Sequence, residues 1–367
     1  MNNPLPGYDA LKTRGLKKAM TLVELMVVIL IGLLIIILMI VTYTTASRQY
    51  VRQDNLVEQM QNLRVAIYSV TRDARMAGSG FRILGGGTVY QLQMADEASG
   101  QWFKHEDRND TGVFPIYGRN SVGPNNSDTL TICWLGAEFA TPIGTLNDDF
   151  TGGGRLELVD SVIDEDEILR PGDKIIIVND KDEALALTFT GWNGGSRKDL
   201  NVRTGISSGG LPEGLELPAE SLVYNVRDIR LVTYQLNNNK ELIANLHGGD
   251  LGDATVEAGD DGNVVGGVVV AANIEDFQVR YLAAQSSLNL DNAPDTISGF
   301  VSTFDQGLAN WPIGGLYIGL TSISSVKDPT NANYRPVDLF DNKDTNRAPD
   351  GYARRTLTEV VKLRNMP

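Results

Sequence analysis

Hydrophobic side chains near the start of the chain follow two patterns in succession. From Leu25 to Val41 there is no charged residue, and almost every side chain is Leu, Ile, Val or Met. A run of this kind predicts a membrane-spanning helix, which needs about 20 residues. From Ser47 the sequence becomes polar without a helix breaker, and apolar residues then recur every three or four positions, at Leu56, Met60, Leu63, Ile67, Val70 and Ala74. This spacing predicts an amphipathic helix that continues the apolar one.

The two patterns together predict one helix over residues 20–77. It is expected to begin near Met20 and to end at Gly78-Ser79-Gly80. A helix of this length would extend for about 85 Å at 1.5 Å per residue. Its apolar stripe has two interpretations, which can both hold at different depths: it packs on the chain's own sheet, or it forms a coiled-coil seam with a partner.

Residues 78–367 are expected to form a β-rich globular domain. After Phe81, Gly, Asn, Asp and Thr become frequent and short alternating or β-branched runs appear. These runs predict an antiparallel sheet region with long loops, and Asn237-Asn238-Asn239-Lys240 predicts a hairpin turn between two of the strands. The predicted strands are Thr88–Met94, Thr129–Leu135, Leu156–Val162, Lys174–Val178, Leu185–Thr190, Leu222–Val226, Arg230–Leu236, Glu241–Asn245, Val268–Ala271, Phe277–Leu282, Leu316–Ser322 and Thr356–Leu363. No repeat and no second domain boundary is evident, and Gly248–Gly267 is interpreted as a long loop or flap.

A single acid, Glu24, stands at the start of the apolar run. An ionised group inside a membrane costs about 2.5–3.5 kcal/mol at the helix centre and less near the ends, so such a residue indicates a function and a partner. The partner expected here is an amino group, freed when the chain is cut just before Met20.

The residues around this acid resemble the class III signal of type IV pilins and type II secretion pseudopilins. In that family a small residue, usually Gly, precedes the cleavage point, and Phe-Thr-Leu-Ile-Glu and a long apolar run follow it. This chain has Ala19 and then Met20-Thr21-Leu22-Val23-Glu24. Ala19 and Met20 depart from the usual residues, whereas Thr21, Leu22 and Glu24 match.

Three later segments resemble PilW-type minor pilins, and the second also resembles J-type minor pseudopilins. They are the helix end Arg72–Gly78, the segment Asn273–Tyr281, and the C-terminal segment Tyr352–Asn365. The resemblance covers about a third of the chain, and residues 81–220 match no family. It implies an α+β, type IV pilin-like fold, with a long N-terminal helix packed on an antiparallel β-rich domain.

The resemblance also implies a mode of action. A prepilin peptidase would remove the leader, residues 1–19, and methylate the new amine of Met20. The chain would then cross the inner membrane once, with its globular domain in the periplasm, before entering a pilus or pseudopilus. Its expected partners are the lipid bilayer, the inner-membrane assembly platform, the major pilin and other minor pilins, and a tip adhesin if the subunit lies near the tip. The bulk of residues 78–367 favours a minor subunit that primes assembly or sits at the tip.

Two other functions stay open. A J-type minor pseudopilin of a type II secretion system shares the same N-terminus, whereas K-type pseudopilins resemble the pattern but lack the acid that Glu24 supplies. A membrane-tethered periplasmic binding module is the alternative from a different class, and it predicts an uncleaved N-terminus and a ligand pocket.

Charge and composition narrow the function further. The 367-residue chain has a formal net charge of −14, which argues against nucleic-acid binding. Basic residues precede the apolar run, including Lys17 and Lys18, and so favour a cytoplasmic leader. The single cysteine, Cys133, is expected to be a buried strand residue.

Little in the sequence indicates catalysis, and no enzyme activity is expected. The chain has only two histidines, His105 and His247, and both lie in polar, loop-like sequence. No cofactor is predicted, with one open question at Asp338, Asp341 and Asp344. These acids are interpreted either as part of a solvated loop or as calcium ligands.

Overall fold

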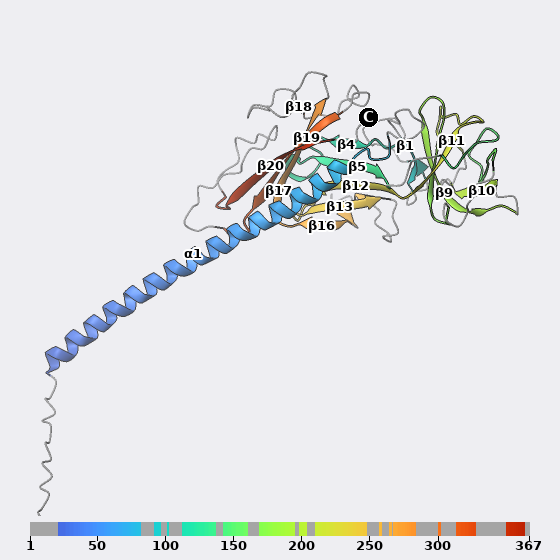
Figure 1. Cartoon of the computed structure of the whole chain (residues 1–367). Coiled ribbons are helices and arrows are strands. Elements are labelled where there is room, and N and C mark those ends of the chain that lie inside the picture. The colour runs from blue at the N-terminus through green and yellow to red at the C-terminus, as the bar shows by residue number, and fades with distance from the viewer. Residues whose placement is uncertain are drawn as a thin grey trace, which may run out of the picture. The chain divides into compact units, whose positions relative to one another are not determined.

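The structure is a computed structural model in which the chain divides into two compact units at Asp54 and Asn55. Figure 1 shows the elements of both units. The described residues are 21–81, 92–96, 101–102, 112–136, 142–160, 169–194, 198–203, 210–247, 257–258, 264–265, 267–283, 300–301, 313–327 and 350–363.

Helix α1 runs from Leu22 to Met76 and contributes residues to both units. Its 55 residues lie within the predicted range of 20–77. The chain leaves the helix through Gly78, whose φ of 70° is readily adopted by glycine. The Gly78 N–H donates to the Cys133 carbonyl at 3.0 Å, and this bond joins the end of the helix to the strand that contains Cys133.

Two antiparallel sheets surround the second half of α1. The first has the order β16-β13-β12-β5-β4 and the second the order β18-β17-β19-β20. The bounds are β4 Ile116–Arg119, β5 Thr129–Leu135, β12 Ile229–Leu236, β13 Leu242–His247, β16 Val268–Ala271, β17 Ile274–Ala283, β18 Phe300–Val301, β19 Ile313–Ile323 and β20 Arg354–Lys362. The turn predicted at residues 237–240 joins β12 and β13, with the Asn237 N–H donating to the Glu241 carbonyl at 3.0 Å.

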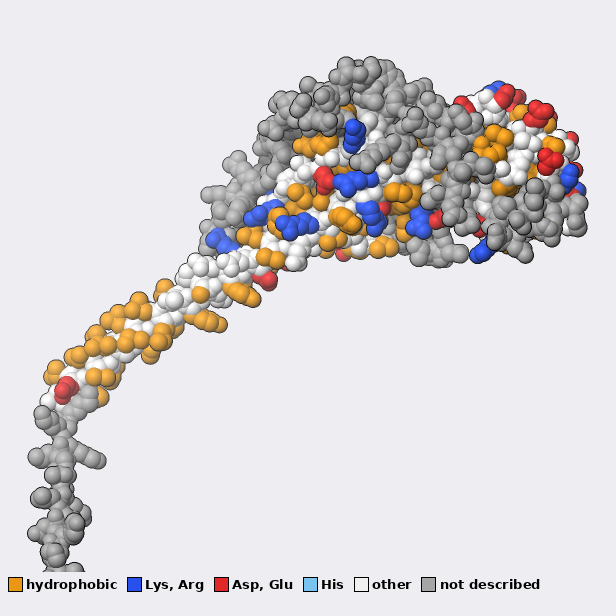
Figure 2. All heavy atoms as spheres, viewed as in Figure 1, with side chains coloured by type: hydrophobic (Ala, Val, Ile, Leu, Met, Phe, Trp, Pro, Cys, Tyr) orange, Lys and Arg blue, Asp and Glu red, His pale blue; other side chains and the backbone are white. Residues whose placement is uncertain are grey.

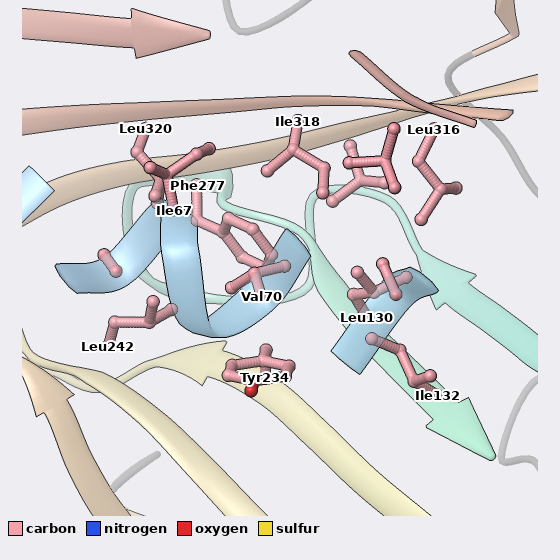
Figure 3. Packing of buried hydrophobic residues seen from close by; sticks show 14 of the residues in the cluster. Ile67, Val70, Leu130, Ile132, Tyr234, Leu242, Phe277, Leu316, Ile318 and Leu320 are labelled. Atoms are coloured by element: carbon pink, nitrogen blue, oxygen red, sulfur yellow. The ribbon is translucent and has the colours of Figure 1, made fainter. Parts of the chain in front are cut away.

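The main core lies where these sheets meet the helix. Figure 3 shows Ile67 and Val70 of α1 between Phe277 and Leu320 on one side and Tyr234 on the other. The two sheets also approach each other at Gly118, where a Cβ atom would lie 1.5 Å from the Tyr281 hydroxyl. Only a glycine fits at that point without moving the tyrosine.

A closed barrel is inserted between β5 and β12, which are neighbours in the first sheet. Its strands are β6 Gly144–Thr145, β7 Arg155–Glu157, β8 Lys174–Val178, β9 Ala184–Trp192, β10 Asp199–Arg203 and β11 Leu222–Arg227, in the order β6-β11-β8-β9-β10-β7. A bridge between Leu146 and Leu158 joins β6 to β7, with the Val159 N–H donating to the Thr145 carbonyl at 3.0 Å, and so closes the ring. The succession β11-β8-β9-β10 is a Greek key.

The barrel leaves and re-enters the first sheet at one place. Leu135 and Ile229 are paired residues of β5 and β12, and the next residue, Gly136, donates its N–H to the Asp228 carbonyl at 2.9 Å. A second core joins the barrel to the outer face of that sheet, through Phe81, Leu92, Met94, Val113, Cys133, Leu135, Ile176, Val178, Ala184, Ala186, Tyr224, Val226, Ile229 and Leu231. A third core fills the barrel.

The described residues also form short elements at the margins. They are β1 Leu92–Gln93, β2 Ala95–Asp96, β3 Gln101–Trp102, the 3₁₀ turn η2 Pro124–Asn126, β14 Glu257–Ala258 and β15 Val264–Val265. Strand β1 pairs with β9 in parallel, whereas every other strand pair is antiparallel among the described residues.

The predicted α+β class is confirmed, with a long N-terminal helix followed by an antiparallel β-rich region. Three predicted strands have the observed bounds, namely β5, β8 and β16. The strands that were not predicted are β2, β3, β4, β6, β10, β14, β15 and β18. Of these, β14 and β15 pair with each other inside Gly248–Gly267, which was interpreted as a long loop or flap. The strand pairing that forms the inserted barrel was not predicted, and the barrel belongs to the same compact unit as the two sheets.

Candidate assembly segment and its scaffold

The helix begins with a reciprocal pair of side chains, Thr21 and Glu24. The Thr21 N–H and hydroxyl both donate to Glu24 Oε2 at 3.3 Å, and the Glu24 N–H donates to Thr21 Oγ1 at 3.2 Å. This is a capping box, in which each side chain accepts the backbone N–H of the other residue, a donor that has no partner within the helix. Within a single chain the Glu24 carboxylate therefore has a local role, which the Thr-x-x-Glu spacing could have predicted.

The residues after the capping box face outward on every side of the helix. From Leu22 to Val41 each large apolar side chain is exposed, and the orange surface in Figure 2 follows this run. In the described part of the chain, α1 is the one helix that is long and apolar enough to cross a membrane. Lipid or other apolar surface must cover such a run, because it exceeds the apolar patches that soluble monomers leave exposed.

The second half of α1 packs against the two antiparallel sheets of the same chain. Leu63, Val70 and Ala74 are fully buried and Ile67 is nearly so, which confirms that the predicted stripe packs on the sheets at these positions. Leu56 and Met60, at the start of the stripe, are only partly buried.

A buried polar contact fixes the position of α1 on β12. The Tyr234 hydroxyl donates to Asp73 Oδ2 at 2.6 Å, and Arg72 Nε lies 2.8 Å from Asp73 Oδ1. Desolvation and the contact with Asp73 raise the pKa of Tyr234, so the hydroxyl keeps its proton and remains the donor.

The two later segments that resemble minor pilins meet at one corner of the scaffold. The side chain of Arg354, at the start of β20, is almost fully buried and forms a bidentate ion pair with Glu275 of β17. Its other guanidinium contacts are to Asp350, at 2.8 and 2.6 Å. Nearby, Gln59 of α1 donates to the Ala353 carbonyl at 2.9 Å. The corner therefore links α1 to the start of β20, and the ion pair links the start of β20 to β17.

The remaining predicted site residues divide into two groups. The processing residues Ala19 and Met20, the leader residues Lys17 and Lys18, and the acids Asp338, Asp341 and Asp344 lie outside the described residues. Among the residues that are described, no cluster of His, Cys, Asp or Glu is suited to a metal ion. Cys133 is fully buried on β5, and burial raises the pKa of its thiol.

Comparisons with known proteins add a distant structural likeness. No protein-family model matches the sequence, and no curated protein matches it. Among solved structures, a type IV-like pilin from Thermus thermophilus is 14% identical with a TM-score of 0.22, and the match covers 54% of this chain and 86% of that one. The observed order of one long helix and an antiparallel β-rich region is itself consistent with a type IV pilin-like α+β fold.

Proposed function

We propose that this chain is a structural subunit of the type IV pilin kind, specifically a minor pilin that primes pilus assembly or sits at its tip. One observation supports this most directly. A single helix begins at a Thr21–Glu24 pair, exposes an unbroken apolar run, and then buries its last turns in an antiparallel scaffold. The same helix can thus pass from lipid to a filament core while the scaffold stays folded.

Processing would prepare the first residues for assembly. Cleavage between Ala19 and Met20 by a prepilin peptidase would place a new ammonium one residue before the capping box. In a helical stack, the Glu24 carboxylate could then pair with the Met20 ammonium of a neighbouring subunit. Pairing offsets the desolvation that each charge would suffer alone in an apolar core.

The apolar run would replace lipid contacts with protein contacts during the same step. Close packing of Leu25–Val41 against other helices is favourable in a lipid-like environment chiefly through van der Waals contact. The partners in this proposal are the inner-membrane platform, the major pilin and other minor pilins.

The decisive experiment is mass spectrometry of the N-terminal peptide from cells with and without the prepilin peptidase. A peptide that begins at N-methylated Met20, found only with the peptidase, would support the pilin pathway. An intact leader in both strains would refute it and favour a tethered binding module. If processing is found, loss of the protein from sheared pili in a pilus-assembly mutant, but not in a type II secretion mutant, distinguishes a minor pilin from a J-type pseudopilin.

A further inference from the structure

The part of α1 between Thr42 and Arg52 marks the end of its apolar run. Three hydroxyl groups there donate back to helix carbonyls: Thr42 Oγ1 to Leu38 at 2.8 Å, and Thr44 Oγ1 and Thr45 Oγ1 to Val41 at 3.0 and 2.8 Å. Bonds of this kind satisfy the hydroxyl within the helix itself. These threonines can therefore lie at the edge of an apolar medium without a further partner.

Two tyrosines lie on either side of this point. Tyr43 and Tyr50 are 76% and 73% exposed, so the chain's own fold covers neither ring. Residues seven apart share one helix face, and these two are separated by about 10 Å along the axis at 1.5 Å per residue. Tyrosine is enriched where a membrane meets water, because its ring is apolar and its hydroxyl is polar.

Two arginines lie on the opposite face at the same level. Arg48 and Arg52 are four residues apart, so they share a face, and at 3.6 residues per turn that face is roughly half a turn from the tyrosines. They are the first charged residues after Glu24. Glu24 and Tyr43 are separated by about 28 Å along the helix, which matches the ~30 Å hydrocarbon thickness of a bilayer.

The change from apolar to polar side chains on α1 thus occurs at one level along its axis and involves both of its faces. The apolar run is exposed on all sides, and the tyrosines and arginines that follow occupy opposite sides of one level. A partner protein would cover one face and leave a difference between faces. Lipid surrounds a single helix evenly and varies only with depth.

We infer that residues 42–52 form an interfacial collar at the outer surface of the membrane, where Arg48 and Arg52 bind the phosphates of anionic phospholipids. This inference rests on the membrane span in the proposed function and adds a ligand to it. Tyr43 and Tyr50 hold the helix at the headgroup level, while each arginine attracts anionic lipid. The collar fixes how much of α1 emerges from the membrane before assembly.

Spin labelling of the full chain in vesicles tests the collar's depth. Nitroxides are attached to single cysteines at each position from 36 to 52, in a Cys133→Ala background, and their oxygen and water accessibility is measured. The expected profile changes steadily with position and crosses from lipid to water within residues 42–52. An oscillation with a period of 3.6 residues would reveal a one-sided protein partner and overturn the inference. Water accessibility throughout positions 36–41 would instead show that the span itself, and the proposed function with it, is wrong.

Energy transfer from a donor dye at Ala46→Cys to headgroup-labelled lipids tests the phosphate contact. Phosphatidylglycerol should be enriched around the donor over phosphatidylcholine. Arg48→Gln with Arg52→Gln should reduce that enrichment by up to about fivefold per arginine. The control replaces Arg64 and Arg203, two exposed arginines outside the collar, with Gln and should keep the enrichment. Equal enrichment in both double variants would refute the assignment of Arg48 and Arg52.

Discussion

Replacing Glu24 can separate its two roles, the helix cap that the structure shows and the intersubunit ion pair that we propose. A glutamine at this position still completes a capping box with Thr21 but carries no charge. Leucine removes both the cap and the charge, and Thr21→Val removes the capping hydroxyl while keeping the carboxylate. The three variants therefore assign any defect to the cap or to the charge.

The expected magnitudes differ enough to be resolved. The capping contacts are 3.2–3.3 Å long and exposed, so their loss should cost about 0.5 kcal/mol, the lower end of the usual range. Loss of one member of a buried ion pair leaves the other uncompensated and costs about 3–5 kcal/mol. The second figure corresponds to a decrease on the order of 100-fold or more in incorporation, since each 1.4 kcal/mol is tenfold.

The assay compares the amount of each variant in sheared filaments with the amount in the inner membrane. Glu24→Gln and Glu24→Leu should both reach the membrane at normal levels and be nearly absent from filaments. Thr21→Val should be incorporated almost normally. If Glu24→Gln enters filaments as well as the unmodified chain does, the ion pair is not needed and the capping box is the sole role of this acid.

Three further predictions concern the scaffold, each measured by denaturant unfolding of the full chain in detergent. Arg354→Met should lower the free energy of unfolding by about 3–5 kcal/mol, because it leaves the buried Glu275 carboxylate uncompensated. The same change at the exposed neighbour Arg355 should have little effect, and equal effects of the two changes would contradict the prediction. Tyr234→Phe should lower it by about 1–3 kcal/mol, since a buried carboxylate loses its donor, and Tyr68→Phe on the exposed face of α1 is the matched control. The Arg354 guanidinium lowers the pKa of Asp350 from 3.8 to about 2, so this acid stabilises the fold above pH 4 and loses that contribution as the pH falls from 4 to 2. Asp350→Asn should flatten the pH dependence of stability in that window, and an unchanged profile would refute the assignment.

The helix and its two environments could be predicted from the sequence because both depend on local periodicity. The uncharged run after Glu24 and the spacing from Leu63 to Ala74 each contain enough residues to define a helix face. The helix start is equally local, since Thr21 and Glu24 have capping-box spacing. The processing residues Ala19 and Met20 lie outside the described residues, so their role stays a prediction.

Hairpin turns were predictable for the same reason, and one sequence pattern occurs twice. In Asn179-x-x-x-Glu183 and Asn237-x-x-x-Glu241, the asparagine Oδ1 accepts the N–H groups two and four residues later, at 2.9–3.0 Å. The residue before each glutamate, Asp182 or Lys240, has a φ of 61°. Only the second of these turns was predicted, although the first has the same spacing.

Contacts between distant segments could not be predicted in this way. Arg354 and Glu275 are far apart in sequence, and either residue alone resembles an ordinary surface charge. Nothing in the sequence around Asp73 indicated that the Tyr234 hydroxyl would donate to its carboxylate. Closure of the barrel depends on the Leu146–Leu158 bridge between very short strands, which leaves no alternating pattern long enough to recognise.

The topology and the packing of the inserted barrel lead to different expectations about whether the barrel can be removed. Gly136 and Asp228 are adjacent, so a short linker could replace residues 137–227 without moving β5 or β12. That geometry alone suggests that the barrel can be removed. However, Leu135, Ile229 and Leu231 are almost fully buried in the core that the barrel shares with the first sheet.

Excision of the barrel should therefore destabilise the rest of the scaffold, because it exposes the shared core. Exposure of each large apolar side chain costs about 1.5–3 kcal/mol, so uncovering three of them would remove much of the 5–15 kcal/mol typical of a folded domain. Cys133 lies in the same core and provides the measurement, because its buried thiol should react slowly with a maleimide in the full chain and rapidly after excision. Leu231→Ala in the full chain is the milder comparison and should increase the reaction rate without removing the barrel. A barrel-free chain with an unreactive thiol and unchanged stability would show that the first sheet does not need this cover, and that the barrel is an independent addition to the scaffold.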